Sequence, residues 1–262
     1  MSNAPLKLGW FSTGRGEGSY GLLMATLKAI ESGDLDASIN FVFCNRERGQ
    51  AQGSDRFILL AESNGIPVVK LSSRHFRKEH GNRPWAELRD DFDRSVLELI
   101  EPFEVDMTVN AGYMLIAPLL CLEHLMINLH PALPSGPVGM WQNVTWQLID
   151  EQATESGAMV HIVTEEVDGG PVLSYCRFST RGKELDPLWR ALAGRSVADL
   201  KEAEQENPLF MRLRELGLAR ERPLIVETLK AIATGRISIQ EAANAGPFDL
   251  TDAVEGSLIV RS

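Results

Sequence analysis

The sequence predicts an α/β fold with a mainly parallel β-sheet and helices on both faces. Short apolar runs alternate with longer amphipathic segments through the first half of the chain, which is typical of βαβ units. Several of these runs are apolar at nearly every position, as expected for strands covered on both faces. The chain has 262 residues, 44% of them hydrophobic, enough for one domain with a large core.

The expected elements follow this alternation. Residues 6–11, 39–44, 67–71, 107–110 and 125–128 are predicted strands, and residues 20–30, 55–63 and 83–101 are predicted helices between them. From residue 157 the rhythm changes to two strands, 157–163 and 171–178, joined by an acidic loop. Ligands of such sheets bind at the carboxyl ends of the strands, so we expect the functional site there.

Two segments near the carboxyl end follow no strand pattern. Segment 184–219 is rich in Leu, Ala, Glu and Arg, with Pro187 and Pro208 placed as in the first turn of a helix. It predicts an inserted helical hairpin, which is either a solvated decoration or oligomer contact, or a cover over the substrate. The tail 245–262 resembles a strand only at 258–260 and is given no role.

Composition excludes several classes of protein. The formal net charge of −10 would repel nucleic-acid phosphates. The three cysteines are far apart in the sequence, as expected for reduced thiols in a cytoplasmic protein, and no apolar stretch reaches 18 residues. The histidines form no metal-binding spacing, so we expect no metal. A homodimer is left open.

A group of polar residues suggests the chemistry. Asn128 and His130 lie where a buried strand ends, and Asp168 follows 38 residues later. Residues i and i+2 of a strand share a face, so the first two side chains can converge. An amide can stabilise an oxyanion, an imidazole can carry a proton, and a carboxylate can orient that imidazole. Together they suit acyl-type transfer involving an amine.

Three ordered motifs resemble the folate-dependent formyltransferase family, most closely its phosphoribosylglycinamide formyltransferase branch. They are Asn128-Leu129-His130-Pro131, Met159-Val160-His161-Ile162-Val163 and Val167-Asp168-Gly169-Gly170-Pro171. The resemblance includes Asn110-Ala111-Gly112-Tyr113-Met114 and covers roughly residues 6–178 and 220–238. It implies a Rossmann-like formyltransferase fold over residues 1–262, as a single domain with the helical segment inserted.

The resemblance also implies the reaction and its site. 10-Formyltetrahydrofolate would donate the formyl group to a primary amine, most closely that of glycinamide ribonucleotide in purine biosynthesis. Asn128 and His130 would stabilise the oxyanion, and Asp168 would keep His130 protonated and help to move the proton. The folate would bind against Tyr113, Met114, Leu115, Ile116, Ala117, Val163, Glu165, Glu166 and Val167. His161 would be a hydrogen-bonded core residue or would contact Asp168 or His130.

A glycine-rich loop between the first strand and the first helix predicts an anion site, because glycines and a helix start expose backbone N–H groups. In the family resemblance this loop holds the substrate's phosphate. The substrate-binding residues would be Gly16, Glu17, Gly18, Ser19 and Tyr20. Here Tyr20 stands where the family has Asn. Glu17 either points to solvent and leaves a phosphate site intact, or faces inward and suits an unphosphorylated amine.

The sequence leaves other functions open. One alternative with the same chemistry is a formyltransferase for another amine, such as an amino sugar. Another is a 10-formyltetrahydrofolate hydrolase, in which water accepts the formyl group. The spacing of Gly16, Gly18 and Gly21 also fits a dinucleotide fingerprint and hence an oxidoreductase. A binding module without activity is a further class. A serine hydrolase is excluded because no Gly-x-Ser-x-Gly surrounds Ser19.

Overall fold

The computed structural model describes residues 4–201 and 207–259. Through this part runs one eight-stranded sheet, in the order β3-β2-β1-β4-β5-β6-β7-β8. The strands are β1 (Leu6–Ser12), β2 (Ala37–Cys44), β3 (Val68–Lys70), β4 (Met107–Asn110), β5 (Met126–His130), β6 (Glu155–Ile162), β7 (Val172–Ser179) and β8 (Phe248–Asp249). β1 to β5 pair in parallel, β6 is antiparallel to both neighbours, and β8 is parallel to β7. The predicted mainly parallel α/β fold is confirmed.

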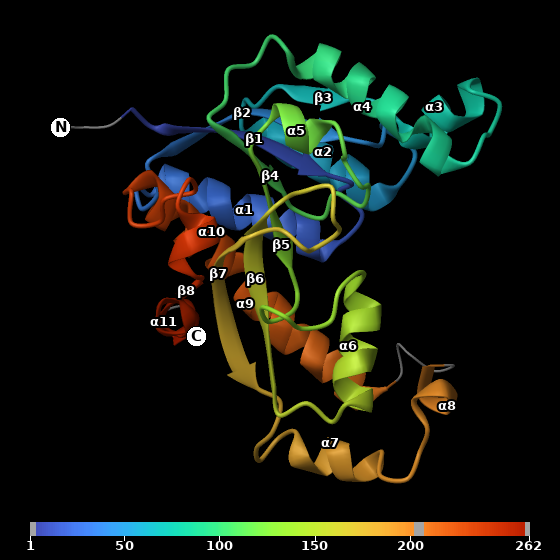
Figure 1. The fold of residues 1–262 in the computed structure, drawn as a ribbon, viewed down its shortest axis with the longest axis vertical. Helices are drawn as coiled ribbons and strands as arrows, with labels where there is room; N and C mark the ends of the chain where they lie inside the picture. Colours follow the sequence, from blue (N-terminus) through green and yellow to red (C-terminus); the bar gives the residue numbers. More distant parts are fainter. Residues whose placement is uncertain (1–3, 202–206, 260–262) are drawn as a thin grey trace.

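Helices cover both faces of the sheet (Figure 1). One face packs against α1 (Glu17–Glu31), α2 (Gln52–Ser63) and α9 (Pro208–Ala233), and the other against α3 (Ser73–Glu79), α4 (Trp85–Ile100) and α5 (Leu120–Glu123). Adjacent residues of one strand serve both cores: Trp10 packs into the first and Phe11 into the second, and both are fully buried. Burial on two faces explains why the strands lack polar alternation.

A smaller cluster lies at the lower end of the molecule in Figure 1. There α6 (Trp141–Asp150), α7 (Asp186–Ala191) and α8 (Val197–Lys201) pack with the first half of α9. The rings of Trp146 and Phe210 stack at its centre, 4.6 Å between centroids. Five apolar residues of segment 184–219 are buried in this cluster: Leu185, Leu200, Leu209, Phe210 and Leu213. The segment therefore packs against α6 rather than standing apart from the domain.

The predicted helical hairpin is wrong in its shape. Pro187 and Pro208 do occupy first turns, of α7 and α9, but the described part of the segment holds three helices rather than two. The last of them does not end near residue 219: α9 continues through Pro223 to Ala233. Its second half is buried against the sheet at residues such as Leu224 and Leu229, and this tertiary packing offsets the hydrogen bond that an internal proline removes.

The tail also differs from expectation. Leu258 and Ile259 belong to a helix, α11 (Thr251–Ile259), instead of a strand, and residue 260 lies outside the described residues. Before it come α10 (Ala242–Ala245) and the two-residue β8, which pairs with Ser174 and Tyr175 of β7. A strand of two residues is too short to show alternation of apolar and polar residues, so the sequence does not predict it. No helix within the described ranges is long and apolar enough to span a membrane.

Candidate active site

The sheet register brings the predicted catalytic residues together at the carboxyl ends of two strands. Asn128 of β5 lies between Asn110 of β4 and His161 of β6. Side chains directly across a sheet share a face, so these three form a polar row. His130 lies two residues beyond Asn128 on the same face, as the sequence predicted.

The imidazole of His130 is held between two oxygen atoms. Its Nδ1 lies 3.4 Å from Oδ2 of Asp168, and its Nε2 lies 2.8 Å from the carbonyl oxygen of Pro137. The side chain is only 3% exposed. Because neither oxygen carries a hydrogen, a protonated imidazole with two N–H groups matches both contacts. The carbonyl oxygen of Pro137 and the carboxylate of Asp168 thus lie at opposite ring nitrogens of His130.

The backbone at Asp168 is shaped to aim its carboxylate at the histidines. Asp168 has a left-handed φ of +54°, which aspartate tolerates better than most residues. Its Oδ2 accepts the N–H of Gly139 at 2.9 Å, and its Oδ1 lies 3.5 Å from Nε2 of His161. Gly170 closes the loop: a Cβ there would lie 1.9 Å from the carbonyl oxygen of Ile162.

These contacts keep Asp168 ionised. Burial alone would raise the pKa of the carboxyl, but the hydrogen bonds from His161 and the Gly139 amide and the charges of both histidines outweigh it, and the pKa is lowered. A charged carboxylate beside His130 can accept a hydrogen bond from Nδ1–H and so orient the imidazole. An imidazole oriented in this way can pass a proton to a leaving nitrogen.

His161 combines both roles considered from the sequence. It is 2% exposed, and its Nδ1 lies 2.9 Å from the carbonyl oxygen of Ile162, as in a hydrogen-bonded core histidine. Its Nε2 faces Asp168 and also lies 3.1 Å from Nδ2 of Asn128. His161 thus connects the amide to the carboxylate of the site.

Sequence reasoning missed the loop between β5 and α6. Pro137 and Gly139 supply backbone groups to His130 and Asp168, and Gly139 adopts a φ of +93° that favours glycine. Contacts made by backbone atoms do not depend on residue type, so the sequence does not reveal them. The only available signal was the density of prolines and glycines over residues 131–139, which marks a shaped loop without indicating its partners.

The predicted folate-binding residues divide into buried and exposed groups. Tyr113 and Ala117 are buried in the core beneath the loop after β4. Leu115 and Val163 are partly buried against that core. The surface is formed by apolar Met114, Ile116 and Val167 together with the exposed carboxylates Glu165 and Glu166. Val167 directly precedes Asp168, and exposed apolar side chains of this kind can line a small-molecule site.

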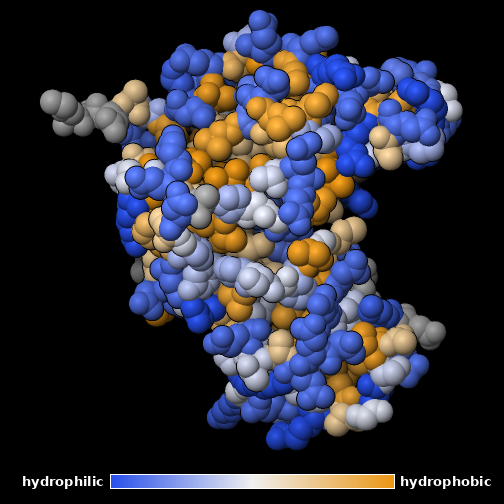
Figure 2. All heavy atoms as spheres, viewed as in Figure 1, coloured by the Kyte–Doolittle hydropathy of each residue, from blue (hydrophilic) through white to orange (hydrophobic). Residues whose placement is uncertain are grey.

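The molecule is indented near this surface. Figure 2 shows a notch between the part that carries α2 and the part that carries α6, with hydrophobic side chains on the loop before α6. That loop includes Val138 and Met140, which are 61% and 49% exposed and flank Gly139. Within the described residues, no three His, Cys, Asp or Glu side chains gather closely enough to hold a metal ion.

The glycine-rich loop is tied to the loop after β4. Thr13 donates its amide to the carbonyl oxygen of Gly112, and its Oγ1 accepts the N–H of Met114. Ser19 approaches the same glycine so closely that a Cβ at Gly112 would lie 2.3 Å from its Oγ. The loops predicted for amine and for folate are therefore in contact.

The predicted amine-binding residues form the start of α1. Gly16 is the N-cap, and the first helical hydrogen bond runs from the Tyr20 amide to the Gly16 carbonyl oxygen, which leaves the amides of residues 17–19 without helical acceptors. The carboxylate of Glu17 binds Arg56 of α2 at 2.7 Å and is 67% exposed. Its negative charge is therefore matched by a guanidinium.

The third glycine of the dinucleotide-like spacing has a packing role. A Cβ at Gly21 would lie 2.3 Å from Nε of Arg222 on α9. Gly21 thus allows α1 and α9 to pack closely. The spacing follows from contact between two helices and gives no support to a dinucleotide site.

Comparison with known proteins gives consistent similarities. The model of the formyl transferase family matches residues 15–179. Phosphoribosylglycinamide formyltransferase from Escherichia coli is 29% identical over 154 residues, 58% of this chain and 64% of that enzyme, a little under two thirds. The enzyme of the same name from Dictyostelium discoideum is 30% identical over 162 residues, 58% of this chain and 74% of that protein.

Solved structures share the fold. Glycinamide ribonucleotide transformylase 1 from Symbiobacterium toebii superposes with a TM-score of 0.64 at 22% identity, covering 92% of this chain and 93% of that one. A formyltetrahydrofolate deformylase from Pseudomonas syringae superposes with a TM-score of 0.63 at 20% identity, covering 92% of this chain and 65% of the deformylase. One fold therefore carries proteins named for transfer to an amine and for deformylation.

Proposed function

Because the chain belongs to the formyl transferase family, as its motifs predicted, we propose that it transfers the formyl group of 10-formyltetrahydrofolate to the primary amine of glycinamide ribonucleotide. The observation that carries this proposal is the convergence of Asn128, His130 and Asp168 on one side of the sheet edge. The alternative functions of other classes, an oxidoreductase and an inactive binding module, are not supported by this family and this site.

The reaction requires stabilisation of an oxyanion and transfer of a proton. The amine lone pair first attacks the formyl carbon, and the carbonyl electrons move onto oxygen. Asn128 can donate an N–H to that oxyanion, and the protonated ring of His130 can add a positive charge beside it. The bond to the folate nitrogen then breaks as a proton passes from the amine to that nitrogen, and Asp168 holds His130 in the form that relays it.

The contact between His130 and Pro137 must change during this cycle. Nε2 of His130 lies 2.8 Å from the Pro137 carbonyl oxygen, so a substrate oxygen that approaches this nitrogen has to displace the contact. Asp168 remains fixed through Gly139, two residues along the same loop. We therefore expect substrate binding to shift Pro137 while the pairing of Asp168 with His130 persists.

The orientation of Glu17 supports a phosphorylated acceptor. Its carboxylate pairs with Arg56 of α2, so its negative charge is matched by a guanidinium next to the amides of residues 17–19. A phosphate can then accept hydrogen bonds from these amides at the positive end of the helix. This is the arrangement we expect for glycinamide ribonucleotide, and it disfavours a cationic amine.

The test is an assay of formyl transfer with a choice of acceptors. The purified protein is incubated with 10-formyltetrahydrofolate, and deformylation is followed by absorbance with glycinamide ribonucleotide, with an unphosphorylated amino sugar, and without amine. Turnover that depends on glycinamide ribonucleotide supports the proposal. Equal turnover without amine would identify a hydrolase, and preference for the amino sugar would refute a phosphorylated acceptor. Asp168→Asn is the matched inactive control.

A further inference from the structure

Asn110 is a buried polar residue of the reaction centre to which the proposed mechanism gives no part. It ends β4 and lies between Phe11 of β1 and Asn128 of β5 in the sheet. The residue is 5% exposed, and its side-chain oxygen has no hydrogen-bond partner among the residues that the structure describes. A buried acceptor without a partner has lost its bonds to water. Such a group in a polar site requires a physical reason.

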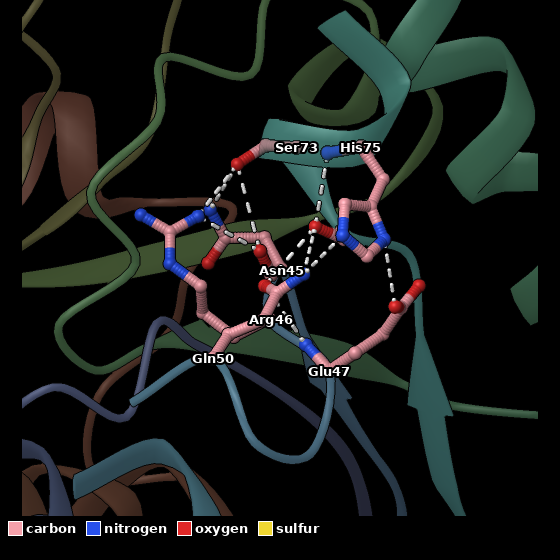
Figure 3. A network of polar contacts seen from close by, with 7 residues as sticks. Asn45, Arg46, Glu47, Gln50, Ser73 and His75 are labelled. Atoms are coloured by element: carbon pink, nitrogen blue, oxygen red, sulfur yellow. Dashed lines mark hydrogen bonds and ion pairs between the residues drawn. The ribbon is translucent and has the colours of Figure 1, made fainter. Parts of the chain in front are cut away.

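A second asparagine, near the carboxyl end of another strand, shows how such a side chain is held when its role is structural. Asn45 follows β2, and its side-chain oxygen is also unpaired. However, its side-chain nitrogen donates to Oγ of Ser73 at 3.1 Å, and its backbone carbonyl oxygen accepts the amide of Ser73 and Nη1 of Arg46 (Figure 3). These bonds fix the loop after β2. Within the described ranges, the side chain of Asn110 makes no bond of this kind.

The side chain of Asn110 faces the half of the site that is predicted to bind the folate. Side chains directly across a sheet share a face, and Phe11, the neighbour on β1, packs into the core that includes Tyr113. The neighbours of Asn110 in its own strand, Val109 and Ala111, belong to the opposite core, which α1 covers. Because the predicted amine site is the start of α1, Asn110 lies on the folate side of the sheet.

The position beside Asn128 determines which part of the folate Asn110 can reach. Neighbouring strands lie about 4.8 Å apart, so the two asparagine side chains border a common space at the strand ends. In the proposed mechanism Asn128 faces the formyl oxygen. A single methylene group joins the formyl-bearing nitrogen to the reduced ring of the folate, and that ring carries N–H groups at positions 5 and 8. A side-chain carbonyl oxygen is the acceptor that such a donor needs.

We infer that Asn110 is a specificity-determining residue for the folate, whose side-chain oxygen accepts a hydrogen bond from an N–H of the reduced ring. The inference rests on the proposed function for its ligand. The χ2 angle of asparagine has broad preferences, so the amide can turn its oxygen toward a bound ring. The contact selects tetrahydrofolates against folates whose ring carries no N–H at these positions, because those leave the oxygen of Asn110 buried and unpaired.

Binding of two folates, measured by calorimetry without an acceptor amine, tests this contact. One ligand is tetrahydrofolate, and the other is 5,8-dideazafolate, in which carbon replaces both of these ring nitrogens. The variant is Asn110→Leu, which keeps the branched arrangement of heavy atoms and removes the polar groups. Each ligand is compared between wild type and variant, so that differences in shape between the two rings cancel.

The effect should be confined to the ligand that carries the N–H groups. We expect the dissociation constant of tetrahydrofolate to rise about tenfold in Asn110→Leu, a usual effect of losing one hydrogen bond, and that of 5,8-dideazafolate to rise by less than about twofold. Equal rises for both ligands, or no rise for tetrahydrofolate, would overturn the inference. Failure of the wild type to bind either ligand would overturn it as well.

Stability measurements separate contact with a ligand from a structural role. Because Asn110→Leu removes an unpaired buried group, the urea midpoint of the protein without ligand should stay the same or rise. Thr108→Val is the matched control on the same strand and face: Thr108 is fully buried, and its Oγ1 donates to the Leu125 carbonyl oxygen at 3.4 Å. Its midpoint should fall, with both dissociation constants unchanged. A lower midpoint in Asn110→Leu with unchanged dissociation constants would show a structural asparagine and refute the inference.

The binding experiment gives an answer that does not depend on the acceptor. Selective weakening of tetrahydrofolate binding in Asn110→Leu, in a protein that transfers no formyl group to glycinamide ribonucleotide, supports the inference and refutes the proposed function alone. If the protein does transfer formyl groups but the variant weakens both folates equally, the proposed function stands and the role of Asn110 is refuted.

Discussion

The reaction centre and the carboxyl end of β2 lie at one edge of the same sheet but place their charges differently. At the centre, the side chains of His130, His161 and Asp168 are at least 90% buried, and both histidines face Asp168. Around the end of β2, Arg15 and Arg74 are exposed, and Arg46 donates to the neutral groups of Asn45 and Ser73. Charges are thus buried and paired in the first region, and exposed or bonded to neutral groups in the second.

This difference follows from what each region has to do. Groups that stabilise a transition state act best when they are already oriented and shielded from water. Exposed charges are screened by water and salt, so each contributes little to a preorganised site. Substitutions at the centre should therefore change turnover strongly, and substitutions of exposed charges should change it little. The following predictions test that division.

The largest effect is expected from the paired residues of the centre. His130→Ala and Asn128→Ala each remove a group that faces the oxyanion, and loss of one such donor typically costs about 100- to 1000-fold in turnover. Asp168→Asn removes the charged partner of His130 and should cost a similar factor. Steady-state kinetics check this. A KM effect with unchanged kcat in any of the three would break the proposed division.

A smaller loss is expected where only the support of Asp168 changes. In Gly170→Ala the new Cβ would meet the Ile162 carbonyl oxygen at 1.9 Å, so the loop must shift. Overpacking of this kind usually costs about 1–3 kcal/mol, and turnover should fall with it. Denaturant unfolding measures the stability. Gly256→Ala, where a Cβ meets nothing within 4 Å, is the control; equal stability of the two variants would contradict the clash.

A third prediction concerns the pKa of a buried carboxyl away from the site, which is raised whereas that of Asp168 is lowered. Asp93 of α4 accepts the amides of Leu119 and Leu120, yet burial raises its pKa to about 6. Since the folded protein binds this proton more tightly than the unfolded chain, stability is greatest below pH 4 for this group and is lost as pH rises through 6.

Asp93→Asn should remove this loss. Between pH 4 and 6, the free energy of unfolding of the wild type should fall relative to the variant by up to about 1.4 kcal/mol per pH unit. Unfolding by urea at four pH values between 4 and 7 measures the difference. Parallel curves for the two proteins would show that Asp93 is not titrating there.

The smallest effect is expected at Glu17. Its pairing with Arg56 is exposed, and water and salt screen such pairs. Glu17→Gln should therefore change KM for a phosphorylated amine by less than about twofold, in contrast to the loss of turnover expected at the reaction centre. A tenfold improvement in KM would mean that the carboxylate faces the bound phosphate in solution and that the orientation in the structure is not the working one.

The extent to which the sequence anticipated the structure differs between these regions. The strands, the order of the motifs and the facing of Asn128 and His130 follow from periodicity, because a strand places alternate residues on one face whatever its surroundings. The motif around Asp168 added the carboxylate. These local rules and the family resemblance were sufficient for the fold class and for the three proposed catalytic side chains.

Tertiary structure alone decided the rest. Pro137 and Gly139 act through backbone atoms, which every sequence has. The direction of Glu17 depends on Arg56, a residue on a different helix, and the continuation of α9 through Pro223 depends on the sheet beneath it. Arg46, in the loop after β2, meets Ser73 at the start of α3. Contacts between distant segments leave no local pattern, so the sequence determined the elements and their chemistry, while packing determined which charges meet.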